Sequence, residues 1–176
     1  KSIPAKKYHI KTGEPVVDAL RKCPHLRLVP PNYELYEKNS KAFMEILKKY
    51  SDKTEQYSID EAFMDMTGTQ LLFGPPVVAA TAIKDEIYHT LGFTVNVGIS
   101  DKKLLAKMAS DFEKPNRVHT LFLKDIREKM WPLPVRDLFF VGSATEQKLH
   151  GLGIRTIGEL AGADVQILKS VLKKHG

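Results

Sequence analysis

The sequence predicts an α+β fold in which strands and packed helices come first and a small helical region follows. Residues 55–66 and 93–99 are rich in the aromatic and branched side chains of strands, and apolar residues alternate strictly in the second segment. Residues 33–50 and 76–91 instead carry apolar side chains at helical spacing. After residue 134 the sequence is helical in composition and punctuated by glycine, which predicts a separate helical unit.

The N-terminal segment has a weaker pattern than the rest of the chain. Residues 1–15 show no clear period, and residues 16–21 are helical in composition. Residues 26–29 form a short apolar run between prolines, which predicts a strand. Because the sequence opens on Lys1 without a clear element, we expect it to begin inside a larger protein.

Helix boundaries in the middle of the chain are marked by proline and serine. A proline pair opens the helix over 76–91, as suits a first helical turn. Ser100 is predicted to cap a helix over 101–112. The Lys-Pro-Asn sequence at 114–116 then ends that helix.

The C-terminal region is predicted to form three short helices over 144–150, 156–161 and 165–174. Thr156 and Asp164 precede the second and third of these helices. Both residue types accept hydrogen bonds from the free N–H groups of a first turn, so we expect them to be N-caps.

Charge is distributed unevenly along the chain, whose net charge is +6. Residues 1–53 hold 12 Lys and Arg against 6 Asp and Glu, residues 54–121 hold 6 against 9, and residues 122–176 hold 9 against 6. Basic ends therefore flank an acidic middle. This distribution suits a protein that holds a polyanionic backbone with its outer parts and divalent cations at its centre.

Composition excludes two classes of protein. Cys23 is the only cysteine, so the chain has neither an internal disulfide framework nor a Cys-based zinc site, and we interpret Cys23 as a partly buried thiol. The sequence has no run of about 18 apolar residues for a membrane span and no secretory leader. We therefore expect a cytoplasmic protein without a membrane partner.

The adjacent acids Asp60 and Glu61 are the most informative local feature. Neighbouring side chains in a strand point to opposite faces, so two adjacent carboxylates can share a ligand only at a turn. If residues 56–59 and 62–66 are the arms of a hairpin, both acids lie at its tip and can converge on a hard cation such as Mg²⁺. A solvated acidic turn is the alternative that the spacing leaves open.

Two basic features follow the acidic pair. Lys103 and Lys107 lie one turn apart on the predicted helix, with Lys114 just after it, and a shared cationic face suits phosphate contacts. An ordinary solvated lysine face is the alternative. Residues 148–160 form a predicted helix, a Gly-x-Gly turn and a second helix.

The Gly-x-Gly turn offers a second way to hold phosphate. Gly151 and Gly153 permit positive φ, which lets backbone N–H groups face a phosphate, and Arg155 adds charge beside them. A plain helical hairpin is the alternative to this DNA-backbone grip.

Four segments together resemble the Y-family, translesion DNA polymerases, the DNA polymerase IV and UmuC-like group. The matching segments are residues 57–63, 98–110, 114–116 and 148–160. Their order and separations fit that family along the whole chain.

The resemblance implies a remnant of the fingers over residues 1–31, a palm over 32–121 and a helix-hairpin-helix thumb over 122–176. Family members begin with a strand that carries another metal-binding aspartate, and they end in a little-finger domain. Neither segment is recognised in these residues. We therefore expect a fragment of a DNA-directed DNA polymerase that is inactive alone.

The resemblance also implies roles for individual residues. Asp60 and Glu61 are expected to be catalytic and to bind the two Mg²⁺ ions of nucleotidyl transfer. Lys6, which stands where many members carry an arginine, and Lys114 are expected to contact the triphosphate of the incoming nucleotide. The expected DNA-binding residues are Ser100, Lys103, Lys107, Gly151, Gly153 and Arg155.

The parent protein is expected to extend primers past damaged template bases. Its implied partners are primer-template DNA, deoxynucleoside triphosphates and a sliding clamp, the last bound through the absent C-terminal part. A non-catalytic DNA-binding module is the main alternative function. A repair nuclease or glycosylase is a weaker one, because the chain lacks a recognisable nucleophilic centre.

Overall fold

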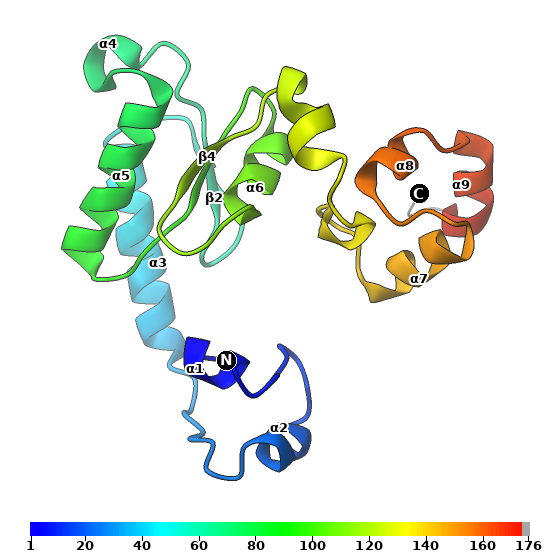
Figure 1. Cartoon of the computed structure of the whole chain (residues 1–176). Coiled ribbons are helices and arrows are strands. Elements are labelled where there is room, and N and C mark those ends of the chain that lie inside the picture. Colours follow the sequence, from blue (N-terminus) through cyan, green and yellow to red (C-terminus); the bar gives the residue numbers. More distant parts are fainter. Residues whose placement is uncertain (174–176) are drawn as a thin grey trace. The chain divides into compact units, whose positions relative to one another are not determined.

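The computed structural model describes residues 1–173, which form two compact units, residues 1–36 and the chain from residue 37 onward (Figure 1). Helices mix with small sheets, so the predicted α+β class is confirmed. The described strands form two separate pairs. The predicted fingers, palm and thumb boundaries remain a prediction.

The first unit contains two short helices, α1 (Ile3–Lys6) and α2 (Val16–Lys22). Its core is small and consists of Ala5, Ile10, Ala19 and Cys23. The thiol of Cys23 is buried, as the composition suggested.

The strand predicted over residues 26–29 is absent, and these residues have no regular structure. Leu28 and Val29 are exposed. Proline has no backbone N–H, so a short apolar run between prolines lacks donors at its ends and can form few hydrogen bonds to a neighbouring strand.

Two long helices build the first core of the larger unit. Helix α3 (Tyr33–Lys48) and helix α5 (Pro76–Leu91) lie beside each other in Figure 1, and the short helix α4 (Gln70–Phe73) precedes α5. Buried side chains from both long helices meet in one cluster, which contains Met44, Ile46, Leu47, Ile83 and Ile87. The two predicted amphipathic helices are thus confirmed.

Strands β1 (Thr54–Gln56) and β2 (Ala62–Met64) form an antiparallel hairpin with Gln56 opposite Ala62. The predicted two-residue turn is wrong, because the connection is a five-residue loop over 57–61. The N–H groups of Tyr57 and Ser58 both donate to the carbonyl of Glu61, at 2.9 and 3.0 Å, and close that loop.

Strands β3 (Val97–Ile99) and β4 (Val118–Thr120) pair in parallel, and helix α6 (Lys103–Asp111) joins them. Strand β3 is shorter than the predicted 93–99. One reason is Asn96, whose side chain accepts from the N–H of Arg117 and donates to the carbonyl of Ser110, at 3.0 and 3.2 Å. The side chain of Asn96 thus makes hydrogen bonds that backbone groups would make in a longer strand.

The predicted N-cap at Ser100 is wrong. Helix α6 begins two residues later than predicted, and its N-cap position is Lys102, which makes no side-chain capping bond. Ser100 instead bonds its neighbours, because its hydroxyl accepts from the N–H of Lys102 at 3.5 Å and donates to Asp101 at 3.2 Å.

Helix α6 lies directly against the backbone of β3 at Gly98. A Cβ atom on residue 98 would lie 1.8 Å from the carbonyl oxygen of Ala106 and 2.6 Å from the N of Ser110. Only glycine fits there. Leu105, Met108 and Ala109 of α6 belong to a second core.

The C-terminal helices form a third core. Short turns η1 (Leu123–Asp125), η2 (Ile126–Met130) and η3 (Val135–Asp137) lead into α7 (Ser143–Gly151), α8 (Ile157–Ala161) and α9 (Val165–Leu172). The buried residues of this core are Val135, Leu149, Ile154 and Leu172.

Both predicted caps in this region are confirmed. The hydroxyl of Thr156 accepts from the N–H of Glu159, whose carboxylate accepts from the N–H of Thr156. Asp164 accepts from the N–H groups of Gln166 and Ile167. Residue 174, the predicted end of the last helix, lies outside the described residues.

Replacing Gly98 by alanine tests the contact between α6 and β3. We expect Gly98→Ala to lower the free energy of unfolding by about 3 kcal/mol, because the new Cβ collides with backbone atoms that cannot rotate away. Urea unfolding measures the change. Gly151→Ala is the matched control, since residue 151 is helical with open space around it, and it should gain up to about 1 kcal/mol.

Candidate metal and nucleic-acid site

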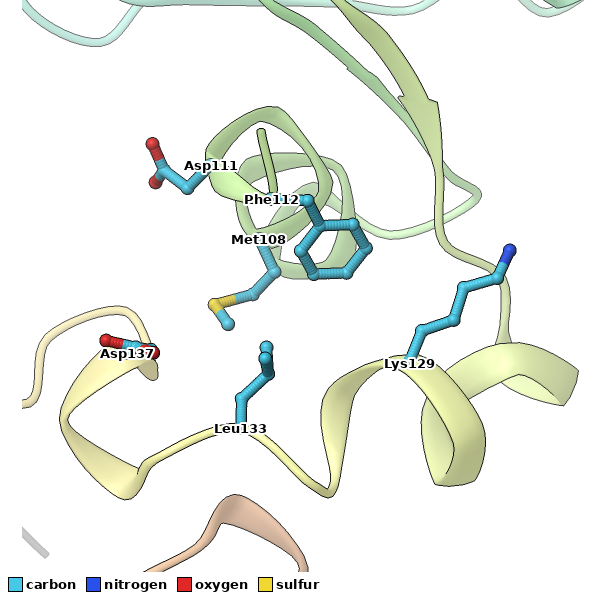
Figure 2. A pocket seen from close by; sticks show the side chains of 6 residues that line it. All are labelled: Met108, Asp111, Phe112, Lys129, Leu133 and Asp137. Carbon is cyan, nitrogen blue, oxygen red and sulfur yellow. The ribbon is translucent and has the colours of Figure 1, made fainter. Parts of the chain in front are cut away.

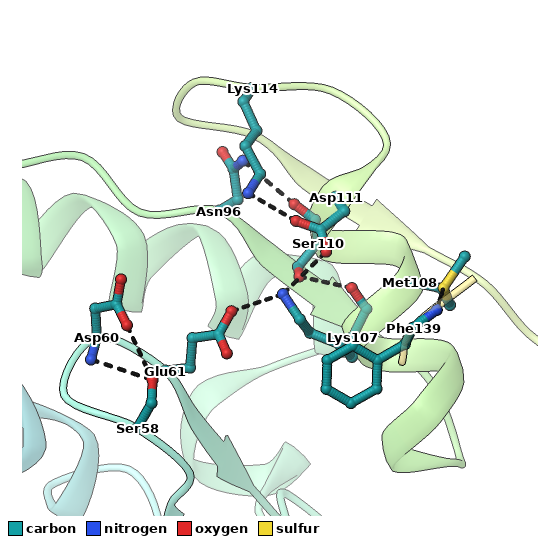
Figure 3. Close-up of polar contacts among 10 residues, drawn as sticks. All are labelled: Ser58, Asp60, Glu61, Asn96, Lys107, Met108, Ser110, Asp111, Lys114 and Phe139. Atoms are coloured by element: carbon teal, nitrogen blue, oxygen red, sulfur yellow. Dashed lines mark hydrogen bonds and ion pairs between the residues drawn. The ribbon is translucent and has the colours of Figure 1, made fainter. Parts of the chain in front are cut away.

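The two acids of the β1–β2 loop have different partners (Figure 3). Asp60 is exposed, and its carboxylate accepts from the hydroxyl of Ser58 at 2.9 Å. Glu61 accepts from the ammonium group of Lys107 on α6 at 2.6 Å. The carboxylate of Asp60 is therefore held within the loop, and that of Glu61 is held by α6.

Lys107 is the centre of a chain of alternating charges. Its ammonium group contacts Glu61 at 2.6 Å and Asp111 at 2.9 Å, and Asp111 also contacts Lys114 at 2.6 Å (Figure 3). We call Glu61, Lys107, Asp111 and Lys114 the ion-pair chain. The side chain of Lys107 is only 13% exposed, so its charge depends on both carboxylates.

The pKa values of the two central groups follow from these contacts. Burial alone would lower the pKa of Lys107, but hydrogen bonds to Glu61 and Asp111 outweigh it and raise the pKa above 10.5. Burial likewise would raise the pKa of Asp111, but hydrogen bonds from Lys114 and Lys107 lower it below 3.8. Both groups are therefore charged at neutral pH.

Lys103 and Lys107 lie on one face of α6, as predicted, and this face turns towards the hairpin, while their DNA-binding roles stay predictions. Lys103 pairs with Glu55 on β1, and its ammonium group lies 5.6 Å from the ring centre of Phe63 on β2. Lys107 lies 5.7 Å from the ring centre of Phe139. Lys6 is the last residue of α1 in the first unit, and its nucleotide-binding role remains a prediction.

The geometry predicted for the Gly-x-Gly turn needs correction. Gly153 has a φ of +80°, but Gly151 ends helix α7 and is not among the glycines with positive φ. The N–H groups of Leu152 and Gly153 donate to helix carbonyls at 3.0 Å. Both N–H groups are thus bonded within the turn and are not the outward-facing donors that the sequence predicted. Residue Arg155 is exposed, and the DNA-binding roles of Gly151, Gly153 and Arg155 stay predictions.

Sequence reasoning missed two parts of this region. Asp111 joins the two lysines Lys107 and Lys114, and the only signals for it were its i,i+4 and i,i+3 spacings from them. Phe139 lies against Lys107 and 6.0 Å from the ring centre of Tyr57, a contact between segments more than 80 residues apart. No local pattern indicates such a contact.

An open pocket of about 580 Å³ lies beside the ion-pair chain (Figure 2). Met108, Asp111 and Phe112 of α6 line it together with Lys129, Leu133 and Asp137. Asp111 thus belongs both to the ion-pair chain and to the wall of this pocket.

The carboxylates of Asp60 and Glu61 are of the chemical type that Mg²⁺ binds, and in this structure each is held by a different partner. Mg²⁺ keeps several waters and is bound through one or two carboxylates plus substrate phosphates, and Asp60 and Glu61 supply two such groups. Among residues 1–173, His, Cys, Asp and Glu side chains do not gather into a cluster of three or more that could hold a metal. The acidic pair therefore suits a metal that takes its other ligands from substrate or water.

Two family models match the chain. The impB/mucB/samB family matches residues 1–111, and the motif named IMS family HHH matches residues 124–154. The second range contains η2 and α7 and ends before α8. The helix-hairpin-helix predicted over 148–160 overlaps only the last seven residues of that range.

Relatives and solved structures agree with the family models. The chain is 51% identical to the DNA polymerase IV of Clostridium acetobutylicum over 176 residues, which is 100% of this chain and 44% of that protein. It is 42% identical to DNA polymerase IV 1 of Bacillus subtilis over 167 residues, or 95% of this chain and 40% of that protein. The chain thus spans less than half the length of these relatives.

Among solved structures, the insertion ternary complex of Dbh DNA polymerase matches with a TM-score of 0.87 and 30% identity, covering 98% of this chain and 51% of that chain. DinB from Sulfolobus solfataricus matches with a TM-score of 0.86 and 30% identity, covering 97% and 50%. The fold is therefore that of one part of a Y-family DNA polymerase. The chain belongs to the impB/mucB/samB family.

No helix among the described residues is long and apolar enough to cross a membrane.

The ion-pair chain predicts a pH dependence of stability. Because the folded-state pKa of Asp111 is lowered, its contribution is present above pH 3.8 and is lost as the pH falls through the lower folded value. We expect Asp111→Asn to be less stable than the unmodified chain at pH 7 and to lose less stability below pH 4. Urea unfolding across that pH range measures both differences in stability. If the variant and the unmodified chain lose stability in parallel as the pH falls, the pKa of Asp111 is not lowered in the folded state.

Proposed function

We propose that these residues are part of an error-prone DNA-directed DNA polymerase that extends primers past damaged template bases. The observation that carries the proposal is the Asp60–Glu61 pair, held in one loop between Ser58 and the Lys107 ammonium group of α6. Membership of the impB/mucB/samB family and relatives named DNA polymerase IV support it. Cytoplasmic location and a sliding-clamp partner belong to the same proposal and rest on the family resemblance.

Asp60 and Glu61 would hold Mg²⁺ in this proposal. Both offer the hard oxygen donors that Mg²⁺ prefers. When bound, the ions would stabilise the charge that develops on the attacking and leaving oxygens of nucleotidyl transfer. Lys107 compensates the charge of Glu61 in the structure, and it fixes that carboxylate on the side of α6.

Lys114 is the lysine best placed to reach a triphosphate in this proposal. Its side chain is 59% exposed, and it pairs only with Asp111 among the ion pairs of the described residues. A surface ion pair of this kind contributes little, so a polyphosphate competes with it easily. Primer-template DNA would lie along the same lysine face, with Lys103 and Lys107 beside it.

The acidic pair provides the first test. In the whole protein that contains these residues, Asp60→Asn and Glu61→Gln should each lower the rate of primer extension at least about a hundredfold, because each removes a metal ligand. Primer-template affinity, measured by fluorescence anisotropy without added metal, should change little.

The control for this test is Glu37→Gln, which removes an exposed carboxylate of α3 that pairs only with its helix neighbour Lys41. It should extend primers at the unmodified rate. Full synthesis by the Asp60 and Glu61 variants would refute the metal-binding role of the acidic pair, and absence of primer extension by the unmodified whole protein would refute the polymerase proposal. A whole protein that binds primer-template DNA without extending primers, and whose affinity is unchanged in those variants, would instead favour a non-catalytic DNA-binding module.

Lys114 provides a second, independent test. Lys114→Ala should raise the KM for deoxynucleotides about tenfold, because it removes one charge-assisted contact to phosphate. Lys114→Arg should restore most of the affinity. Lys124→Ala, which changes an exposed lysine of η1, is the control and should leave KM unchanged. An unchanged KM in Lys114→Ala would exclude the nucleotide contact.

A further inference from the structure

Four aromatic rings lie in a row between the β1–β2 hairpin and the segment that precedes α7. The ring centres of Phe63 and Tyr57 are 5.7 Å apart, those of Tyr57 and Phe139 are 6.0 Å apart, and those of Phe139 and Phe140 are 4.1 Å apart. We call these four residues the aromatic row. Its members come from the loop, from β2 and from the connection to the C-terminal helices.

We propose that the Phe140 end of the aromatic row is a platform on which an unpaired DNA base stacks. This inference rests on the proposed function, because it names the part of the DNA that binds next to the acidic pair. Lys107 contacts both Glu61 and the ring of Phe139, which is the neighbour of Phe140 in the row, so the row adjoins the acidic pair.

Phe140 is the least buried member of the row and the most unusual. It is 80% exposed, and its backbone has a φ of +73°, a region that L-residues with large side chains rarely adopt. A phenylalanine there costs conformational energy and leaves an apolar ring in water. Local strain of this kind clusters at ligand-binding positions.

Two other rings of the row, Phe139 and Phe63, contact the helix that carries the lysines. Lys107 lies over the ring of Phe139 and Lys103 over the ring of Phe63. The N–H of Phe139 also donates to the sulfur of Met108 at 3.4 Å. A platform that is fixed in this way loses little conformational freedom when a flat ligand stacks on it.

The chemistry of the row identifies the occupant as a nucleobase. Every base has a π-face, and stacking on aromatic side chains beside a cationic surface is how proteins hold single strands without reading their sequence. Bases inside a duplex are already stacked, so the base must be unpaired, as in a single strand or at a frayed primer end.

The test replaces Phe140 by glycine in the chain of residues 1–176. Glycine adopts positive φ freely, so Phe140→Gly removes the ring and relieves the backbone, and its melting temperature should not fall. The probe is a short single-stranded oligonucleotide with a fluorescent adenine analogue, titrated without metal. We expect the affinity to fall about tenfold and the quenching of the analogue to be lost.

Two controls make the result specific. Phe140→Trp should keep or increase the quenching, and Tyr88→Ala, which removes an exposed aromatic side chain of α5, should leave binding unchanged. The affinity difference between Phe140→Gly and the unmodified chain should persist at high salt, because stacking involves no counterion release.

Unchanged quenching in Phe140→Gly would overturn the platform, as would equal losses for single-stranded and fully paired DNA or binding of free nucleotides only. These outcomes leave the polymerase proposal intact, since that proposal depends on primer extension by the whole protein. Conversely, absence of primer extension by the unmodified whole protein refutes the polymerase while stacking on Phe140 persists.

Discussion

Helix α6 lies so close to β3 that a single methyl group on residue 98 has no room. With only a hydrogen on Gly98, the helix backbone rests on the strand backbone, and both elements become one rigid layer. The lysines of α6 then reach the β1–β2 hairpin, where Lys103 meets Glu55 and Lys107 meets Glu61. A wider separation of helix and strand would withdraw both ammonium groups from their carboxylates.

The charges of this layer depend on one another. Lys107 is nearly buried, and a buried ammonium group persists in its charged form only beside compensating carboxylates. Glu61 and Asp111 provide that compensation from two different elements, the hairpin loop and α6 itself. The position of Glu61 is therefore coupled to the docking of α6, whereas Asp60 is held within the loop by Ser58. The position of Glu61 therefore depends on the helix, and the position of Asp60 depends on the loop.

Local sequence patterns correctly predicted the elements whose structure is determined by local interactions. The helices over 33–48 and 76–91 and the caps Thr156 and Asp164 follow from apolar spacing and from side-chain acceptors near their own backbone, and the structure has them. The hairpin was predicted from its strands, but its loop is longer than predicted. The carbonyl of Glu61 accepts hydrogen bonds from the N–H groups of Tyr57 and Ser58, and a two-residue turn would not allow this pairing.

The predictions failed at positions where a distant contact or a competing hydrogen bond determines the local structure. Ser100 has the residue type of an N-cap, yet α6 begins at Lys103, where packing on Gly98 sets its position. Gly151 could have adopted positive φ, but it continues α7 as a helical residue. Phe139 joins the site only through contacts with residues far away in the sequence, so no spacing points to it, whereas the only signals for Asp111 were its helical spacings from Lys107 and Lys114.

The same helix also decides where the aromatic row lies. Phe139 is held to α6 twice, by its N–H donating to Met108 and by the Lys107 ammonium group over its ring. Lys107 in turn contacts Glu61, so one side chain touches the metal-ligand candidate and the inner ring of the row. A shift of α6 would therefore move the acid and the ring together. In the proposed complex, the position of the base relative to the acidic pair would therefore depend on the docking of α6, which holds both Glu61 and Phe139.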